Sequence, residues 1–117
     1  MAQNDIEAGL PKTIRDFFRA SNAHRTEDLL ACFADNGEVL DDGGRYEGRD
    51  MIRAWSGQNY IGAQVHAEPI GMEPREGEWA VQVDITGDYP GGPYRFWFCF
   101  TLDQGRISKL EIMEVSS

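Results

Sequence analysis

The chain has few basic residues for its size, and this limits the partners that it can have. Its 117 residues include 11 Lys and Arg against 20 Asp and Glu, which gives a formal net charge of -9 at pH 7. A surface this acidic repels the phosphate backbone of nucleic acids and anionic lipid headgroups. The composition therefore argues against nucleic acid and against a membrane as partners.

The sequence also lacks a secretion signal and a long apolar run. The N-terminal segment MAQNDIEAGLPK contains no basic stretch followed by apolar residues. No apolar run approaches the roughly 20 residues that a membrane-spanning helix needs. We expect a cytoplasmic protein with a single domain, residues 1–117, because this length suits one hydrophobic core and is too short for two.

Cysteine and histidine are scarce, and neither is spaced for a metal. Cys32 and Cys99 are far apart and show no Cys-x-x-Cys spacing. The simplest interpretation is two buried free thiols in a cytoplasmic protein, with a disulfide between them as the alternative. The 2 histidines stand alone in the sequence, which predicts no metal site. Gly43-Gly44 is not followed by a Lys at phosphate-loop spacing, so we expect no cofactor.

Aromatic and aliphatic residues are plentiful, and in the first half they recur at helical spacing. Pro11 suits the first turn of a helix, where its missing N–H is not needed. Thr26 and Asp50 are residue types that cap helix N-termini. We therefore expect helices over residues 11–23, 26–36 and 50–57, with a short strand at 38–41 between the second and the third.

In the second half the period changes to two. Strands are predicted over residues 63–73, 78–89, 93–102 and 106–115, separated by turns rich in Gly and Pro. Phe96, Phe98 and Phe100 share one face of the third strand, while Trp97 and Cys99 share the other. Such alternation predicts a mostly antiparallel sheet with one buried face, and helices followed by strands predict an α+β domain. The apolar residues on the second face predict a homodimer through that outer face.

Three segments carry a family resemblance: IRDFFRASNAHRTEDLLACFADNGEVLDD, YEGRDMIRAW and FWFCFTLDQGRISKLEIM. They resemble the nuclear transport factor 2-like superfamily, which includes ketosteroid isomerase and the SnoaL-like polyketide cyclases. The resemblance covers most of the chain. It implies a cone-shaped α+β barrel, in which three N-terminal helices pack on a strongly curved, mixed, mostly antiparallel sheet. In this superfamily the open end of the cone is commonly a small-molecule pocket.

The resemblance places Asp41 where ketosteroid isomerase has its catalytic carboxylate, and so implies a general base. A carboxylate ringed by apolar side chains has its charged form destabilised and its basicity raised. The alternative is that Asp41, Asp42 and the glycines after them only form a turn. Phe17 and Phe98 occupy the positions of the two hydrogen-bond donors of ketosteroid isomerase. Because one such donor is typically worth about 10²–10³ in rate, ketosteroid isomerase activity itself is not expected.

The apolar side chains on the inner faces of these elements can line a ligand cavity or fill it. The candidate lining residues are Phe17, Trp55, Val81, Val83, Ile85, Phe96, Phe98, Phe100, Leu110 and Ile112. We expect a cofactor-independent isomerase, cyclase or dehydratase that acts on a small apolar, carbonyl-bearing or cyclic ligand, with Asp41 as general base. The alternative is a non-catalytic ligand-binding or dimerisation module of the same fold.

Overall fold

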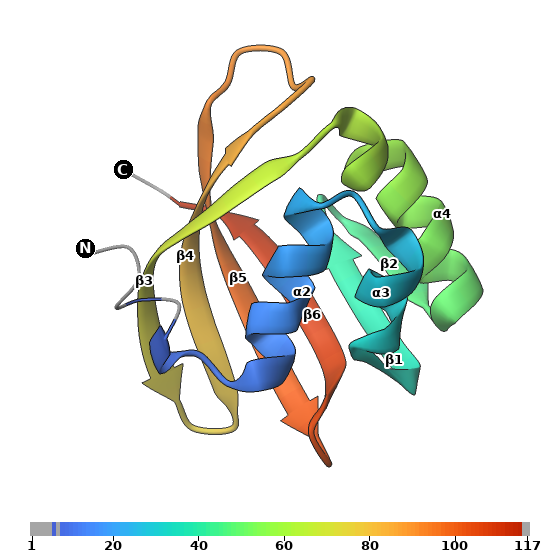
Figure 1. The fold of residues 1–117 in the computed structure, drawn as a ribbon, viewed down its shortest axis with the longest axis vertical. Coiled ribbons are helices and arrows are strands. Elements are labelled where there is room, and N and C mark those ends of the chain that lie inside the picture. Colours follow the sequence, from blue (N-terminus) through green and yellow to red (C-terminus); the bar gives the residue numbers. More distant parts are fainter. Residues whose placement is uncertain (1–5, 7, 116–117) are drawn as a thin grey trace.

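The computed structural model describes Ile6 and residues 8–115. In the described part of the chain, the helical elements and the first two strands precede the last four strands (Figure 1). The helical elements are α2 (Lys12–Asn22), α3 (Thr26–Ala31), α4 (Arg49–Asn59) and the 3-10 helix η1 (Ile61–Ala63). The strands are β1 (Phe33–Asp41), β2 (Gly44–Glu47), β3 (His66–Arg75), β4 (Glu78–Thr86), β5 (Tyr94–Asp103) and β6 (Arg106–Glu114).

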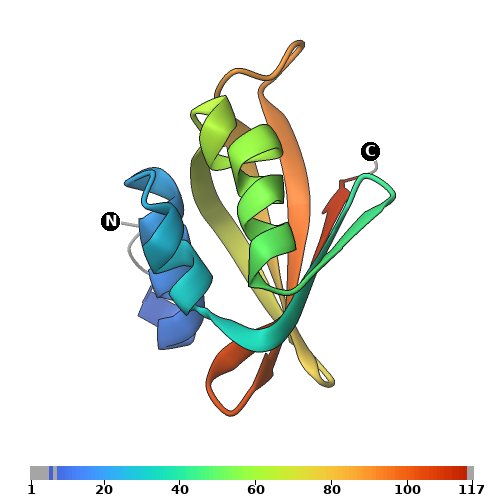
Figure 2. The same cartoon turned by 90° about the vertical axis from the view of Figure 1, so that its right-hand side faces the viewer.

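The strands form one 6-stranded sheet in the order β2-β1-β6-β5-β4-β3. β1 and β6 are parallel, and every other neighbouring pair is antiparallel. Helices α2, α3 and α4 lie on one face of the sheet, which curves around them (Figures 1 and 2). This confirms the predicted α+β class and the mixed, mostly antiparallel sheet. Because β2 and β3 are edge strands, the cone is open rather than a closed barrel.

The face of the sheet toward the helices carries the apolar residues that the alternation predicts. Across the strands, Val81 pairs with Phe98, Phe98 with Ile112, and Ile112 with Asp41. Directly opposed residues share a face, so all four side chains lie on the inner face. Phe17 of α2 packs against Phe98 from the helix layer, with the ring centroids 6.3 Å apart. The four opposed side chains thus form a row across the inner face, and the row ends at the carboxylate of Asp41 on the concave side of the sheet.

The second helix is shorter than the sequence predicts. α3 ends at Ala31 and β1 begins at Phe33, whereas the predicted helix continued to about residue 36. Phe33 pairs with Ile107 of β6, and a register shift follows before pairing resumes farther along β1. Gly37 lies in this irregular stretch, where an added Cβ would come within 2.9 Å of Ile107 O. Parallel pairing with β6 thus overrides the local helical preference and requires glycine at the close approach.

Two turns also differ from the prediction. The third helix begins at Arg49, one residue earlier than expected, because Gly48 serves as its N-cap with a φ of 88°. The predicted three-residue loop 103–105 is a two-residue turn, in which Gln104 and Gly105 have φ values of 51° and 79°. Turns with two positive φ values follow the twist of a hairpin. The remaining predicted elements match the structure within a few residues.

Cys32 and Cys99 are buried free thiols, as predicted. Burial raises the pKa of both thiols, that of Cys32 to about 11, so neither is activated as a nucleophile. Among the residues that the structure describes, no helix is long and apolar enough to cross a membrane. The same residues contain no group of three or more His, Cys, Asp or Glu that could hold a metal ion.

Candidate functional site

A pocket lies at the end of the sheet where β1 ends, and the segment that connects β4 to β5 forms part of its wall. Its outer compartment has a volume of about 620 Å³, and an inner compartment of about 120 Å³ adjoins it. The two share the walls Asp41, Asn59, Tyr89, Tyr94, Phe96 and Ile112. Apolar and aromatic side chains dominate the inner compartment, whereas acidic and amide side chains surround the outer one. An apolar cavity with a few polar groups is the usual form of a small-molecule site.

The candidate lining residues divide between the pocket wall and the core. Those that border the inner compartment are Trp55, Ile85, Phe96, Phe98 and Ile112. Those that are fully buried and border neither compartment are Phe17, Val81, Val83, Phe100 and Leu110. The second group lies deeper in the cone, where helix α2 packs against the sheet and fills the space. Half of the expected lining residues are thus packed core.

Asp41 is half-buried at the end of β1 and borders both compartments. Trp55 Nε1 donates a hydrogen bond to Asp41 Oδ2 at 2.9 Å. Burial raises the pKa of Asp41, the hydrogen bond from Trp55 opposes that rise, and the negative charge of Asp42 adds to it. The net result is a pKa above the ordinary value of an aspartate. One carboxylate oxygen is held by the indole, which leaves Oδ1 for a ligand.

A stack of aromatic rings holds Trp55 in place. The Tyr60 ring lies parallel to Trp55, with centroids 4.9 Å apart, and also to Phe17 at 5.8 Å. Complete burial raises the pKa of Tyr60 far above its usual value, and the nearby Ser21 hydroxyl acts in the opposite direction. Ser21 Oγ donates to Phe17 O at 2.7 Å, and the buried Tyr60 hydroxyl has no hydrogen-bond partner of normal geometry among the described residues. The orientation of the Asp41 carboxylate therefore depends on the packed core.

Two tyrosines close the pocket, and their hydroxyl groups are bonded to the backbone. Tyr89 donates to Asn59 O at 3.0 Å, and Tyr94 donates to Pro90 O. Burial, together with the negative charge of Asp41, raises the pKa of Tyr89 to about 12. Sequence reasoning missed Asn59, Tyr89 and Tyr94 as pocket residues. The available signal was an aromatic residue within GDYPGGP, a loop-forming segment of the kind that often carries binding residues.

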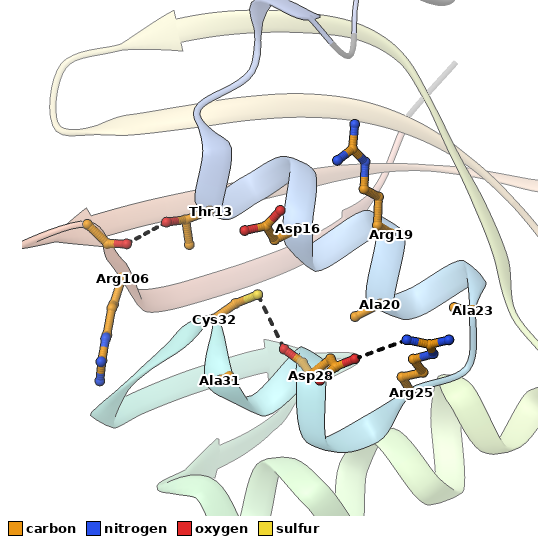
Figure 3. A pocket seen from close by; sticks show the side chains of 11 residues that line it. Thr13, Asp16, Arg19, Ala20, Ala23, Arg25, Asp28, Ala31, Cys32 and Arg106 are labelled. Carbon is orange, nitrogen blue, oxygen red and sulfur yellow. Dashed lines mark hydrogen bonds and ion pairs between the residues drawn. The ribbon is translucent and has the colours of Figure 1, made fainter.

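A second cavity, of about 490 Å³, lies between α2, α3 and the start of β6 (Figure 3). Arg25 Nη1 lies 3.8 Å from Asp28 Oδ2 at its rim. The side chains of Arg19 and Arg106 extend in opposite directions (Figure 3). These charged groups do not converge on a common point. The cavity is therefore a weaker candidate for a functional site than the pocket at Asp41.

The comparison with family models gives a SnoaL-like domain over residues 14–110. The chain belongs to the SnoaL-like domain family. Among solved structures, a proposed polyketide cyclase from Sinorhizobium meliloti is 30% identical, with a TM-score of 0.86 over 92% of this chain and 98% of that one. The Δ5-3-ketosteroid isomerase of a Mycobacterium species is 19% identical, with a TM-score of 0.74 over 88% of this chain and 90% of that one. No curated protein matches the chain.

A third structure is that of a Mycobacterium tuberculosis protein in complex with estradiol-17β-hemisuccinate. It is 18% identical to the SnoaL-like chain, with a TM-score of 0.74 over 86% of this chain and 88% of that one. At such identities the steroid-related structures show the fold alone. Together, these comparisons confirm the predicted superfamily and the cone-shaped α+β fold.

Proposed function

We propose that this SnoaL-like protein is a cofactor-independent isomerase, cyclase or dehydratase, and that Asp41 is its general base. The observation that carries the proposal is the environment of Asp41, whose Oδ2 accepts the Trp55 hydrogen bond and which borders a compartment lined mostly by apolar and aromatic side chains. Burial also raises its pKa, and a base works best when its pKa approaches the working pH. The ligand in this proposal is small, mostly apolar, and carbonyl-bearing or cyclic.

In the proposed reaction, a carbon next to the substrate carbonyl gives its proton to Asp41 Oδ1. The electron pair of that C–H bond forms a C=C bond, and the carbonyl oxygen becomes negative. An isomerase returns the proton to another carbon of the conjugated system. In a cyclase the new nucleophilic carbon attacks a second carbonyl, and the proton passes to the resulting alkoxide. In a dehydratase the proton leaves with a hydroxyl group as water, and every route restores the ionised Asp41.

Deuterium exchange tests this proposal without knowledge of the substrate. A panel of apolar cyclic ketones in D₂O is incubated with the protein, and incorporation next to the carbonyl is followed by NMR. We expect exchange to fall about 10²–10⁴-fold in Asp41→Asn, the range typical of a general base. Asp103→Asn, which removes an exposed carboxylate that borders neither compartment, is the matched control. Equal exchange by the wild type and Asp41→Asn would exclude Asp41 as the base.

A non-catalytic ligand-binding module is the second candidate, and one observation favours it. Phe17 and Phe98, at the positions where the family resemblance implies hydrogen-bond donors, are 0% and 1% exposed and pack against each other. Hydrocarbon therefore fills the space where donors would stabilise a developing negative charge. Tight binding of an apolar ligand with no exchange for any ketone of the panel would support this candidate.

We also propose that two copies pair through the outer face of the sheet. Trp97 lies on that face with the Arg75 guanidinium 5.1 Å from its ring, and its β6 register partner Met113 is 41% exposed. Cys99 is only 2% exposed, so it would add little to the contact. We expect sedimentation equilibrium at micromolar concentration to give twice the 13.2 kDa chain mass, and Trp97→Glu to give the single chain. A wild-type protein that sediments as a single chain would contradict this.

A further inference from the structure

We propose that the side-chain amide of Asn59 is the hydrogen-bond donor that faces the ligand oxygen opposite Asp41. This inference rests on the proposed function, since it names the group that stabilises the negative oxygen formed when Asp41 takes a proton. Asn59 borders both the inner and the outer compartment, as Asp41 does. A ligand whose apolar body fills the inner compartment would place its polar end at this junction.

Helix α4 brings the amide to the base. Trp55 and Asn59 are four residues apart on α4, so they lie one turn apart on the same face of the helix. Trp55 Nε1 is bonded to Asp41 Oδ2 at 2.9 Å. The residue that orients the base and the residue proposed as donor therefore belong to one rigid element. The helix thus fixes the backbone of the exposed Asn59 relative to the base, and a site built on a helix is more precise than one built on a loop.

The loop across the pocket fixes the backbone of Asn59. Tyr89 donates its hydroxyl to Asn59 O at 3.0 Å and lies in the wall of both compartments. The side chain of Asn59 makes no hydrogen bond within the described residues, so both amide hydrogens are available to a ligand. Its backbone is held while its amide is free.

The other donors near the junction are committed, fully buried or confined to one compartment. Tyr89 and Tyr94 donate to backbone carbonyls. The Tyr60 hydroxyl has no hydrogen-bond partner among the described residues, but it is buried and Tyr60 borders only the inner compartment. Tyr46 and Gln58 border the outer compartment but not the inner one. Asn59 is thus the neutral donor common to both compartments whose side chain has no partner in the described part of the chain.

The test uses 2-naphthol as a stable mimic of the oxyanion and 2-methylnaphthalene as its counterpart without oxygen. Both are bound to Asp41→Asn, in which a neutral amide stands for the protonated base, and the ionised form of 2-naphthol is read from its absorbance. We expect Asn59→Leu in this background to weaken binding of the naphtholate about tenfold or more, the usual effect of a hydrogen bond to a charged group. Binding of 2-methylnaphthalene should change by less than about twofold, because leucine keeps the branched shape and the number of side-chain heavy atoms of asparagine.

Two further variants sharpen the result. Asn59→Asp keeps the shape and replaces the donors by a charge, so it should bind naphtholate more weakly than Asn59→Leu does. Asn36→Leu is the matched control, since it makes the same substitution at an exposed asparagine of β1 that borders neither compartment. An equal loss for both ligands in Asn59→Leu would overturn the inference, and so would a naphtholate-specific loss in Tyr46→Phe with none in Asn59→Leu.

The outcome separates this inference from the proposed function. If deuterium exchange is the same in Asp41→Asn as in the wild type, the proposed function fails. The ratio of the affinities for naphtholate and 2-methylnaphthalene still measures the hydrogen bond that Asn59 donates. If exchange depends on Asp41 and the ratio does not change in Asn59→Leu, only the assignment of Asn59 fails.

Discussion

The hydrogen bond from Trp55 Nε1 to Asp41 Oδ2 links the packed core to the candidate base. Trp55 is 0% exposed, and its ring stacks on Tyr60 with an interplanar angle of 16°. The indole cannot turn without disturbing that stack, so the carboxylate has one preferred orientation. A fixed base is more effective than a mobile one because its orientation is set before the substrate arrives. The same indole ring therefore orients the carboxylate and lowers its pKa against the larger effect of burial.

Replacing Asp41 should show how much its ionised carboxylate lowers the free energy of unfolding. The pKa of Asp41 is raised in the folded protein, so between the unfolded and the folded pKa the folded state holds the proton more tightly. Stability therefore falls as the pH rises through this window, and ionised Asp41 is a cost above it. We expect Asp41→Asn to gain stability over the wild type as the pH rises, measured by urea unfolding across a pH series. Asp103→Asn, which removes an exposed carboxylate at a distant turn, should show no such gain. A difference independent of pH would contradict the argument.

Trp55→Phe separates the hydrogen bond from the aromatic packing. Phenylalanine keeps a ring in the stack and removes the N–H, so the pKa of Asp41 should rise further, because the bond lowers it in the wild type. The acid limb of the exchange rate should then move to higher pH. We expect a loss of about 1–3 kcal/mol in unfolding free energy, from the smaller ring and the lost bond. Trp79→Phe is the control, because it removes an indole that packs against the core without bonding to Asp41. An unmoved acid limb in Trp55→Phe would show that the bond does not tune the base.

Among the elements, the strands were predictable because the pleat fixes a period of two. The alternation around Phe98 placed its neighbours on the correct faces, and the register confirms this for β4, β5 and β6. The boundary between α3 and β1 was not predictable in the same way. Phe33 continues the helical spacing of Leu29 and Leu30, yet it pairs with Ile107, which lies far along the chain. Local spacing carries no information about such a contact.

The same limit separates the site residues that could be predicted from the sequence from those that could not. Asp41 could be singled out because the family resemblance marked its position. Asn59 and Tyr89 could not be brought together from the sequence, since 30 residues separate them and their contact depends on how the loop crosses α4. Phe17 and Phe100 were expected at the pocket, but the depth of a residue within a cone depends on how far α2 enters it.

The side chain of Asn22 attaches the end of α2 to β3, which predicts a large effect for a surface residue. Asn22 Nδ2 donates to Ala67 O at 2.8 Å, and Ala67 N–H donates to Asn22 Oδ1 at 2.7 Å. The amide thus takes the place of a neighbouring strand at the edge of the sheet. We expect Asn22→Ala to lower the unfolding free energy by about 1–3 kcal/mol, because both polar groups of the buried Ala67 lose a partner. Asn36→Ala, at an exposed asparagine, should change it by less than about 0.5 kcal/mol in the same urea titration. Equal effects of the two substitutions would contradict this role.

For the molecule as a whole, charge is distributed in a way that bears on the ligand. Within the described part of the chain, the lining of the outer compartment includes Asp41, Asp42, Asp88 and Glu114 and contains no Lys, Arg or His. The chain also carries a formal net charge of -9. A charged ligand would therefore meet both the local field of the pocket and the field of the whole protein. Either field disfavours an anion, and the two can be separated by experiment.

We predict that the pocket binds neutral or cationic apolar molecules better than anionic ones of the same shape. 2-Methylnaphthalene and 2-naphthoate form a matched neutral and anionic pair, and we expect the anion to bind at least about tenfold more weakly at low salt, as a few partly screened charge pairs would give. Raising the ionic strength should reduce the difference, because the screening length falls from about 30 Å at 0.01 M to about 3 Å at 1 M. Calorimetric titration of both ligands at the two salt concentrations measures this difference in affinity.

Two double variants with the same change in net charge then locate the cause. Asp88→Asn with Glu114→Gln removes charge from the pocket wall, whereas Glu76→Gln with Asp103→Asn removes it from the two hairpin ends at the opposite end of the sheet (Figure 1). If the pocket field selects the ligand, only the first pair should strengthen binding of 2-naphthoate relative to 2-methylnaphthalene. Equal effects of the two pairs would assign the selectivity to the net charge of the protein, because charges separated by the length of the sheet act on a ligand only through the long-range field.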